Sequence, residues 1–278
     1  MSAGRLKWDE VTKRLYETGV SKGVFYPYES DGTYGAGESW NGLTQVTESP
    51  SGAESNPIYA DNTKYLDLRS TEDFNATIEA YTYPDGFASA DGKKEMIKGV
   101  RIAQQKRSPF GFCYQTIIGN DTEYNDYGYT IHLVYGATAS PSEKTRSTVN
   151  DSPEATAMSW ELTTVPVVVP GFKPTAHLEI DSTDFTDAQM AAIEKALYGS
   201  DAVEAADAVY AKTSDETKQA GKTYYTKDGT VYTEFSGGTF ASNTDYYEMV
   251  SPAVTASAAT EAYLPLPTEV VSILEGAA

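Results

Sequence analysis

Apolar and polar residues alternate in several stretches of the first 180 residues. The alternation runs through 76–80, 129–135, 158–162 and 176–180, where every second side chain is apolar or aromatic. A period of two is typical of a strand with one buried face. The 21 tyrosines of the chain also favour strands. The pattern therefore predicts a mainly β (α+β) fold.

One helix is predicted after these strands. Thr186 is a suitable N-cap, and Gln189 three residues later completes the pattern of a capping box. Phe185 and Met190 flank this cap at the spacing of a hydrophobic staple. An apolar stripe follows, and Gly199 lies where a helix commonly ends. We expect this helix to pack one face against the sheet.

Two long stretches between the predicted strands are polar. Residues 29–57 and 140–157 are rich in Gly, Pro, Ser, Asn and Asp. Such a composition predicts loops. Loops of this length are usually functional or ordered by a partner.

The residue pattern of the sequence changes after Asp201, and this change marks a division of the chain into domains. Residues 203–257 read as a small inserted β module, in which Asp228-Gly229 between two apolar-aromatic runs predicts a hairpin. Residues 1–202 form the main domain in this interpretation. Residues 258–278 return to it through an apolar, helix-like ending.

The net charge limits the partners that the chain can bind. Asp and Glu number 40 against 21 Lys and Arg, which gives a formal charge of −19. Such a surface repels phosphate and disfavours ordinary nucleic-acid binding. The wall of a channel through which DNA slides without sticking would, however, be acidic. No stretch approaches the length of a membrane span, and residues 1–20 lack a signal-peptide pattern, so we expect a soluble product without membrane insertion.

The residues available for a metal site or a nucleophilic pair are few. Cys113 is the single cysteine and cannot form an internal disulfide. With His132 and His177 it shows none of the spacings of a zinc site. We interpret these residues as a buried thiol and two strand histidines, although a Cys113–His132 nucleophilic pair is conceivable. The acidic run 121–126 fails the EF-hand pattern, because its twelfth position is His132, and is read as a hairpin loop.

Other chemical signatures are equally incomplete. Gly35 and Gly37 hint at a phosphate loop but lack the third glycine and a following helix. Acidic pairs such as those among Glu48, Glu54, Asp61 and Glu79 could serve a glycosidase. With 40 acidic residues, chance pairs are inevitable. We therefore expect no catalytic residue, no cofactor and no metal, and we interpret the chain as a non-enzyme.

Several segments, taken in order, resemble the major tail tube proteins of long-tailed (siphovirus-type) phages of Gram-positive bacteria. The resemblance covers about residues 5–201 and the 263–267 tail. It is carried by GVFYPY (23–28), WNGLTQVTESP (40–50), YADNTKY (59–65), AYTYPD (80–85), 110–136, PSEK (141–144), VNDSP (149–153) and WE (160–161).

This resemblance implies a fold and a function. The fold would be a tail-tube-type β-sandwich or barrel with one flanking helix. Hexameric rings of the chain would stack into a tube around a tape-measure protein, bounded by tail terminator and baseplate proteins. Phage DNA would later pass through the lumen without specific binding. The protein would be located in the virion, after assembly in the bacterial cytoplasm.

The expected assembly assigns roles to several parts of the chain. Open strand edges would pair around the ring, and the stretches 29–57 and 140–157 would connect successive rings. Candidates for an acidic lumen are Glu79, Glu161 and Glu179, which lie on the polar faces of predicted strands.

The inserted module departs from the simpler members of the family. We expect residues 203–257 to project outward, because a bulky module in the lumen would block DNA. The tyrosines of the module either form a glycan-binding face or make up the core of a minimal β unit, which we favour. They are Tyr210, Tyr224, Tyr225, Tyr232, Tyr246 and Tyr247.

Two other functions remain as alternatives. A surface or fibre-type carbohydrate-binding protein would bind ligand as a monomer or trimer. A glycoside hydrolase would depend on two close carboxylates, and the sequence singles out no pair.

Overall fold

The computed structural model describes residues 7–146, 148, 151, 155–242 and 244–278. The fold is mainly β, as the alternating pattern predicts. The chain divides into two compact units. The first runs up to Gly199 and resumes with Glu261–Ala278, and the second is Ser200–Thr260.

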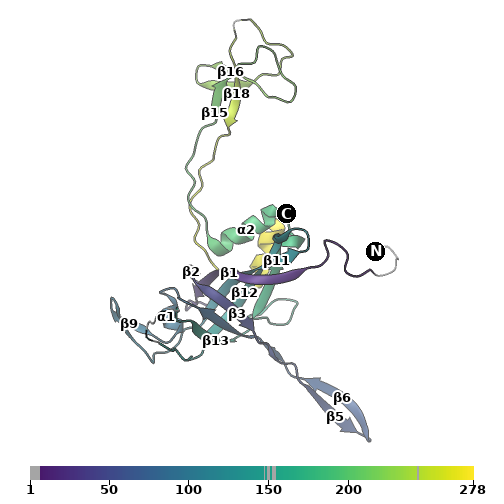
Figure 1. The fold of residues 1–278 in the computed structure, drawn as a ribbon, viewed down its shortest axis with the longest axis vertical. Helices are drawn as coiled ribbons and strands as arrows, with labels where there is room; N and C mark the ends of the chain where they lie inside the picture. Colours follow the sequence, from purple (N-terminus) through teal and green to yellow (C-terminus); the bar gives the residue numbers. More distant parts are fainter. Residues whose placement is uncertain (1–6, 147, 149–150, 152–154, 243) are drawn as a thin grey trace. The chain divides into compact units, whose positions relative to one another are not determined.

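A rolled antiparallel sheet forms the body of the first unit (Figure 1). Its two end strands, β2 and β3, are consecutive in the chain and joined through Asn41 and Gly42, so the sheet curls back on itself. Gly23 marks the close approach, since a Cβ there would lie 2.3 Å from Leu43 Cδ1. The strands follow the order β2 (Glu38–Trp40), β1 (Tyr16–Pro27), β11 (Phe110–Asn120), β12 (Tyr124–Ala139), β13 (Met158–Thr164), β8 (Asn75–Ala80) and β3 (Leu43–Glu48), and β14 (His177–Asp181) also pairs with β12.

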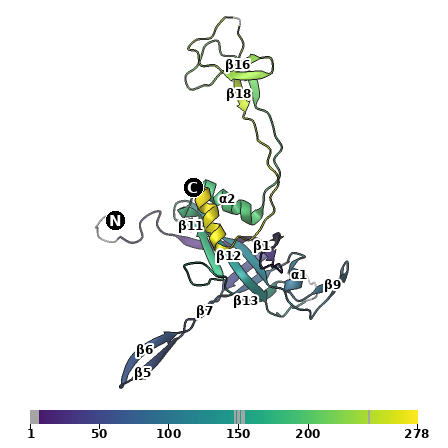
Figure 2. The same cartoon turned by 180° about the vertical axis from the view of Figure 1, so that it is seen from behind.

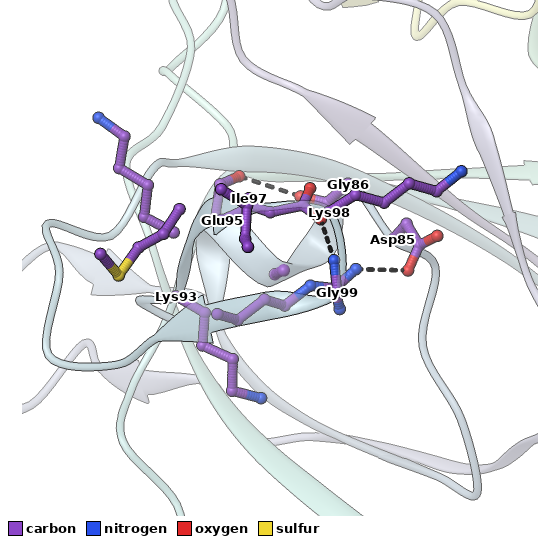
Figure 3. Close-up of a pocket in the computed structure, with 12 residues that line it drawn as sticks. Asp85, Gly86, Lys93, Glu95, Ile97, Lys98 and Gly99 are labelled. Atoms are coloured by element: carbon purple, nitrogen blue, oxygen red, sulfur yellow. Dashed lines mark hydrogen bonds and ion pairs between the residues drawn. The ribbon is translucent and has the colours of Figure 1, made fainter.

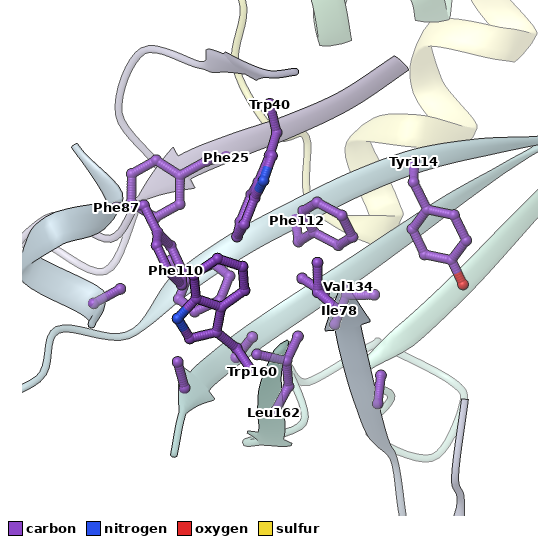
Figure 4. Packing of buried hydrophobic residues seen from close by; sticks show 14 of the residues in the cluster. Phe25, Trp40, Ile78, Phe87, Phe110, Phe112, Tyr114, Val134, Trp160 and Leu162 are labelled. Carbon is purple, nitrogen blue, oxygen red and sulfur yellow. The ribbon is translucent and has the colours of Figure 1, made fainter. Parts of the chain in front are cut away.

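An aromatic core fills the inside of the roll (Figure 4). Trp160 meets Trp40 and Phe87 edge-on, with ring centroids 5.6 and 5.2 Å apart, a favourable geometry for aromatic pairs. The short helix α1 (Phe87–Ala90) supplies Phe87. Both indole nitrogens donate hydrogen bonds, Trp40 Nε1 to the Thr82 carbonyl at 2.8 Å and Trp160 Nε1 to Asp91 Oδ1 at 3.1 Å.

A second core lies on the outer face of the roll beneath two helices, α2 (Asp187–Tyr198) and α3 (Pro267–Gly276). The predicted capping box of α2 is confirmed, because Thr186 and Gln189 exchange both bonds. The helix-like end of the chain becomes α3, so two helices rather than one flank the sheet. A 3₁₀ turn, η1 (Ser182–Asp184), leads from β14 towards α2.

One loop prediction was wrong. The polar stretch 29–57 contains β2, β3, β4 (Ser51–Gly52) and the first half of β5 (Ser55–Ala60). Its Ser, Asn and Gly content is high, and Leu43 and Val46 of β3, which both pack on the aromatic core, are three residues apart because the register with β8 shifts between Leu43 and Gln45. This strand therefore shows no period-two pattern. The described part of 140–157 contains no helix or strand before β13, and the remaining residues of that stretch lie outside the described residues.

Three two-stranded ladders extend from the roll (Figures 1 and 2). They involve short or exposed strands. Their pairs are β4 with β7 (Glu72–Asp73), β5 with β6 (Thr63–Arg69), and β9 (Lys94–Ile97) with β10 (Val100–Ile102).

The second unit is a small four-stranded antiparallel sheet on a two-stranded stalk. The expected Asp228-Gly229 hairpin is present between β16 and β17. The stalk pairs Ser200 with Thr260, and then residues 203 with 257 and 206 with 254. The strand order is β15 (Val209–Lys212), β18 (Tyr246–Ser251), β16 (Tyr225–Asp228) and β17 (Val231–Glu234).

Candidate functional site

Residues 51–73, here called the arm, carry exposed apolar side chains along paired strands. In the β5–β6 ladder Ile58 lies opposite Leu66, and Leu68 follows two residues later on the same face. These side chains are 40%, 38% and 52% exposed, and the neighbouring Tyr65 is 71% exposed. Isolated two-stranded ladders are at best marginally stable in water. The arm therefore has the properties of an element that is completed by a partner.

The rolled sheet also leaves strand edges open. Among the described residues, β2 pairs with β1 only at Gly23, Val24 and Phe25, so the edge of Tyr16–Lys22 is free. The outer edges of β3 and β14 are likewise unpaired in this part of the chain. Open edges offer rows of N–H and C=O groups to another strand.

A surface hollow lies beside the β9–β10 ladder (Figure 3). Arg101 Nη2 donates to Asp85 Oδ1 at 2.8 Å, and Glu95 Oε1 accepts from the Gly99 amide at 2.7 Å. Met96 and Ile97 are exposed. The residues that line the hollow include no cysteine and no histidine.

The structure separates the three candidates for an acidic lumen. Glu79 and Glu161 lie on neighbouring strands with Ile78 and Trp160 facing the opposite way, into the core. They therefore share the outer face of β8 and β13. Glu179 lies on β14 on the inner face of the roll and joins a different group of residues.

That group is a histidine–carboxylate cluster of Glu48, His132, His177 and Glu179. One ligand-type atom from each residue lies within 4.8 Å of all the others. Pairing of β12 with β14 sets His132 opposite Glu179, and the end of β3 brings Glu48 across from them. Glu48 Oε1 is 3.6 Å from both His132 Nδ1 and His177 Nε2.

Neighbouring rings hold the cluster rigid. The rings of Tyr114 and His132 stack at 4.5 Å, and His177 stacks on Phe74 at 4.4 Å. The Tyr114 hydroxyl donates to Glu48 Oε1. Burial lowers the pKa of His177, although the nearby Glu48 carboxylate opposes this shift. Its imidazole is thereby favoured in the neutral form.

The remaining predicted residues do not form a catalytic site. Cys113 is fully buried in the outer core, and burial raises the pKa of its thiol to about 12, so it is unreactive. Residues 121–123 form the turn between β11 and β12, and residues 124–126 already belong to β12. Glu54 and Asp61 belong to the arm, away from the strand positions of Glu48 and Glu79.

The second unit splits its tyrosines between two faces of its sheet. Tyr224 and Tyr246 are buried and pack against the half-buried Phe235 and Phe240. A second aromatic group is half-buried, with centroids of neighbouring rings 4.0–5.2 Å apart. Its members are Tyr210, Tyr225, Tyr232 and Tyr247.

Comparison with known proteins adds no assignment. No family model matches the chain, and no curated protein matches it. Among the helices of the described residues, none combines the length and the apolar character needed to cross a bilayer.

Sequence reasoning missed the histidine–carboxylate cluster because its members come from three strands without a local motif. The signal that was present is the alternation in 129–135 and 176–180, which places His132 and His177 on the polar sides of their strands. Only the pairing of β12 with β14 turns those positions into neighbours.

Proposed function

We propose that this chain is the major tail tube protein of a long-tailed phage, a structural and non-catalytic virion subunit. Hexameric rings of the chain stack into a tube, which encloses a tape-measure protein and later conducts DNA during genome ejection. Tail terminator and baseplate proteins bound the tube. Assembly takes place in the cytoplasm of the bacterial host.

The observation that carries this proposal is the exposed arm. A ladder with Ile58, Leu66 and Leu68 on one face requires a second apolar layer, and the described chain leaves that face exposed. A second copy in the next ring can provide that layer. Because such a contact joins different surfaces of two copies, it propagates and produces a filament rather than a closed dimer.

The sheet edges and the charge support the same assembly. The free edges of β1, β3 and β14 suit pairing around a ring, where closure removes the edges. The net charge of −19 suits a channel that repels the DNA backbone. Glu79 and Glu161 share one exposed sheet face and are the better pair of lumen candidates, since Glu179 belongs to the cluster.

Electron microscopy of the purified chain tests the proposal. At rising concentration, or with baseplate and tape-measure proteins added, negative-stain images should show six-fold rings or hollow tubes. Replacing Ile58, Leu66 and Leu68 together by Ser should abolish the tubes and leave the thermal unfolding midpoint of the monomer unchanged. A chain that remains monomeric even with those partners would refute the tube function.

A matched control distinguishes the arm from exposed apolar residues in general. Val231, Met249 and Val250 are also exposed on strands, in the second unit. Their replacement by Ser should leave tube formation intact. Loss of tubes in both triple variants would mean that reduced surface hydrophobicity, not the arm, controls assembly.

The half-buried tyrosines of the second unit favour a second candidate function, carbohydrate binding. Rings such as Tyr210 and Tyr232 stack on each other and present apolar surface next to phenolic hydroxyl groups, which suits sugar rings. In the tube, this unit would project outward and touch cell-surface glycans. Binding of purified Gram-positive cell-wall polysaccharide should be lost in Tyr232→Ala and retained in Tyr59→Ala on the arm.

A further inference from the structure

We propose that Glu48, His132, His177 and Glu179 bind one divalent transition-metal ion, with Zn²⁺ the preferred occupant. Two imidazole nitrogens and two carboxylate oxygens form a donor set that suits first-row divalent ions, among which Zn²⁺ accepts four ligands readily. The site goes beyond the tube function and does not depend on it.

The spacing of the donor atoms fits tetrahedral coordination. Bonds of 2.0–2.1 Å in a tetrahedron place neighbouring ligand atoms about 3.3–3.4 Å apart. Glu48 Oε1 is 3.6 Å from each histidine nitrogen, and Glu179 Oε1 is 3.8 Å from His132 Nδ1. All four donor atoms lie within 4.8 Å of one another, so the more distant pairs must move closer when an ion binds. Glu179, whose side chain is 59% exposed, has the freedom to move.

Within the described chain, each imidazole has one nitrogen in the cluster without a hydrogen-bond partner. His132 is only 5% exposed, yet its Nδ1 has no hydrogen-bond partner among the described residues, and neither does His177 Nε2. At 3.6 Å the carboxylate of Glu48 is too far to accept a hydrogen bond from either nitrogen. Buried nitrogens without partners are costly, and a metal ion would satisfy both.

The hydrogen bonds around His132 fix which of its nitrogens is free. The Thr116 hydroxyl donates its only proton to Glu17, so it can only accept at its second contact, 2.9 Å from His132 Nε2. Nε2 of His132 therefore donates this hydrogen bond, which leaves Nδ1 as the nitrogen that lies in the cluster. Glu17 thus orients His132 through the Thr116 hydroxyl. Metal-binding histidines commonly use their second nitrogen for such an outer contact.

The charges around the site call for a cation. Glu17, Glu48 and Glu179 converge on the two imidazoles, and in the described part of the chain no lysine or arginine pairs with any of them. A divalent ion would compensate this negative charge.

The position of the site links it to the base of the arm. Glu48 is the last residue of β3, just before the arm begins, and Phe74 follows the arm directly and stacks on His177. An ion held by Glu48 and by residues of β12 and β14 would fasten this base to the rolled sheet.

Metal titration of the tag-free, chelator-treated full chain tests the site. Co²⁺ should produce the visible absorption of a tetrahedral complex, saturating at one ion per chain, and Zn²⁺ should displace it. At about 100 times its dissociation constant, Zn²⁺ should raise the unfolding midpoint by about 5–10 °C. Hydrogen exchange at residues 44–50 and 73–77 should slow when Zn²⁺ is added.

Two variants decide whether these four residues bind the metal. Glu179→Gln changes an exposed ligand without threatening the fold and should weaken Zn²⁺ binding at least about tenfold. Glu161→Gln changes a carboxylate on the outer face and should bind like the wild type. A colourless Co²⁺ titration, or equal binding by the wild type and Glu179→Gln, would overturn the site and leave a charged histidine–carboxylate pair as the explanation of the cluster.

Discussion

The rolled sheet and the arm both place apolar side chains on one face of their strands. These side chains are buried in the rolled sheet and exposed on the arm. Strand β8 alternates Ala76 and Ile78 towards the core, where both are buried, while β6 alternates Leu66 and Leu68 along one face that stays exposed. Alternation therefore determines which residues share a face, but burial requires a second layer. The roll provides this layer by curling, and its outer face receives it from α2 and α3. The described chain provides no such layer for the arm.

The largest effect should come from removing a core aromatic residue. Trp160→Ala leaves a cavity among Trp40, Phe87 and Tyr83 and should lower the free energy of unfolding by about 3–5 kcal/mol. Tyr65→Ala, on the arm, should change it by less than about 0.5 kcal/mol. Urea unfolding of both variants measures the difference. Similar losses in the two variants would mean that the arm is buried in the free chain, which would contradict the contrast between a buried core and an exposed arm.

The second largest loss of stability should come from removing a buried charge. The size of this loss should depend on pH. Asp91 is buried beside the core, where it accepts from Trp160 and pairs with Lys144 and Lys93 at 2.7 Å each. Burial alone would raise the pKa of Asp91, but the hydrogen bonds from the two lysines outweigh it and lower the pKa. Asp91→Asn should cost about 1–3 kcal/mol near neutral pH.

The pH dependence of this variant has a definite sign. Because the folded pKa of Asp91 lies below its unfolded value, its stabilisation is complete above about pH 4 and is lost as the pH falls through the folded pKa. The stabilities of wild type and Asp91→Asn should therefore converge in acid. Urea unfolding at a series of pH values checks this, and a constant gap down to the lowest pH would rule out the ion pairs as its cause.

These contrasts also explain how much of the molecule the sequence could predict. Strands β8, β12, β13 and β14 of the roll and the helix after Thr186 were predictable, because period two and a capping box are local signals. Strands β2 to β5 were missed because a polar, Gly-rich composition hid Leu43 and Val46, whose burial depends on the rolled sheet. The histidine–carboxylate cluster depends on strand pairing over long sequence distances, which no local pattern encodes.

A smaller effect should follow from loosening the helical layer over the outer core. Thr186 accepts from the Gln189 amide at the start of α2, and Gln189 Nε2 also donates to the Leu274 carbonyl of α3 at 2.9 Å. Thr186→Ala should cost about 1 kcal/mol. Thr63→Ala, at the turn of the arm, is the exposed control and should cost less. An equal loss at both positions would mean that α2 contributes no more to the stability of the sheet than the arm does.

The smallest effect should come from removing the second unit altogether. Ser200 and Thr260 exchange both backbone hydrogen bonds, at 3.0 and 2.9 Å, so Gly199 and Glu261 can be joined through a short Gly-Ser link. The outer core keeps its own contacts on either side of the joint, including the Tyr263 amide donating to the Ala196 carbonyl at 2.8 Å. Both aromatic groups of the second unit belong to its own sheet, so its loss should remove no layer from the roll. The unfolding midpoint of the shortened chain should match that of the first unit in the full chain, measured by calorimetry. A midpoint lower by several degrees would show that the second unit stabilises the rolled sheet.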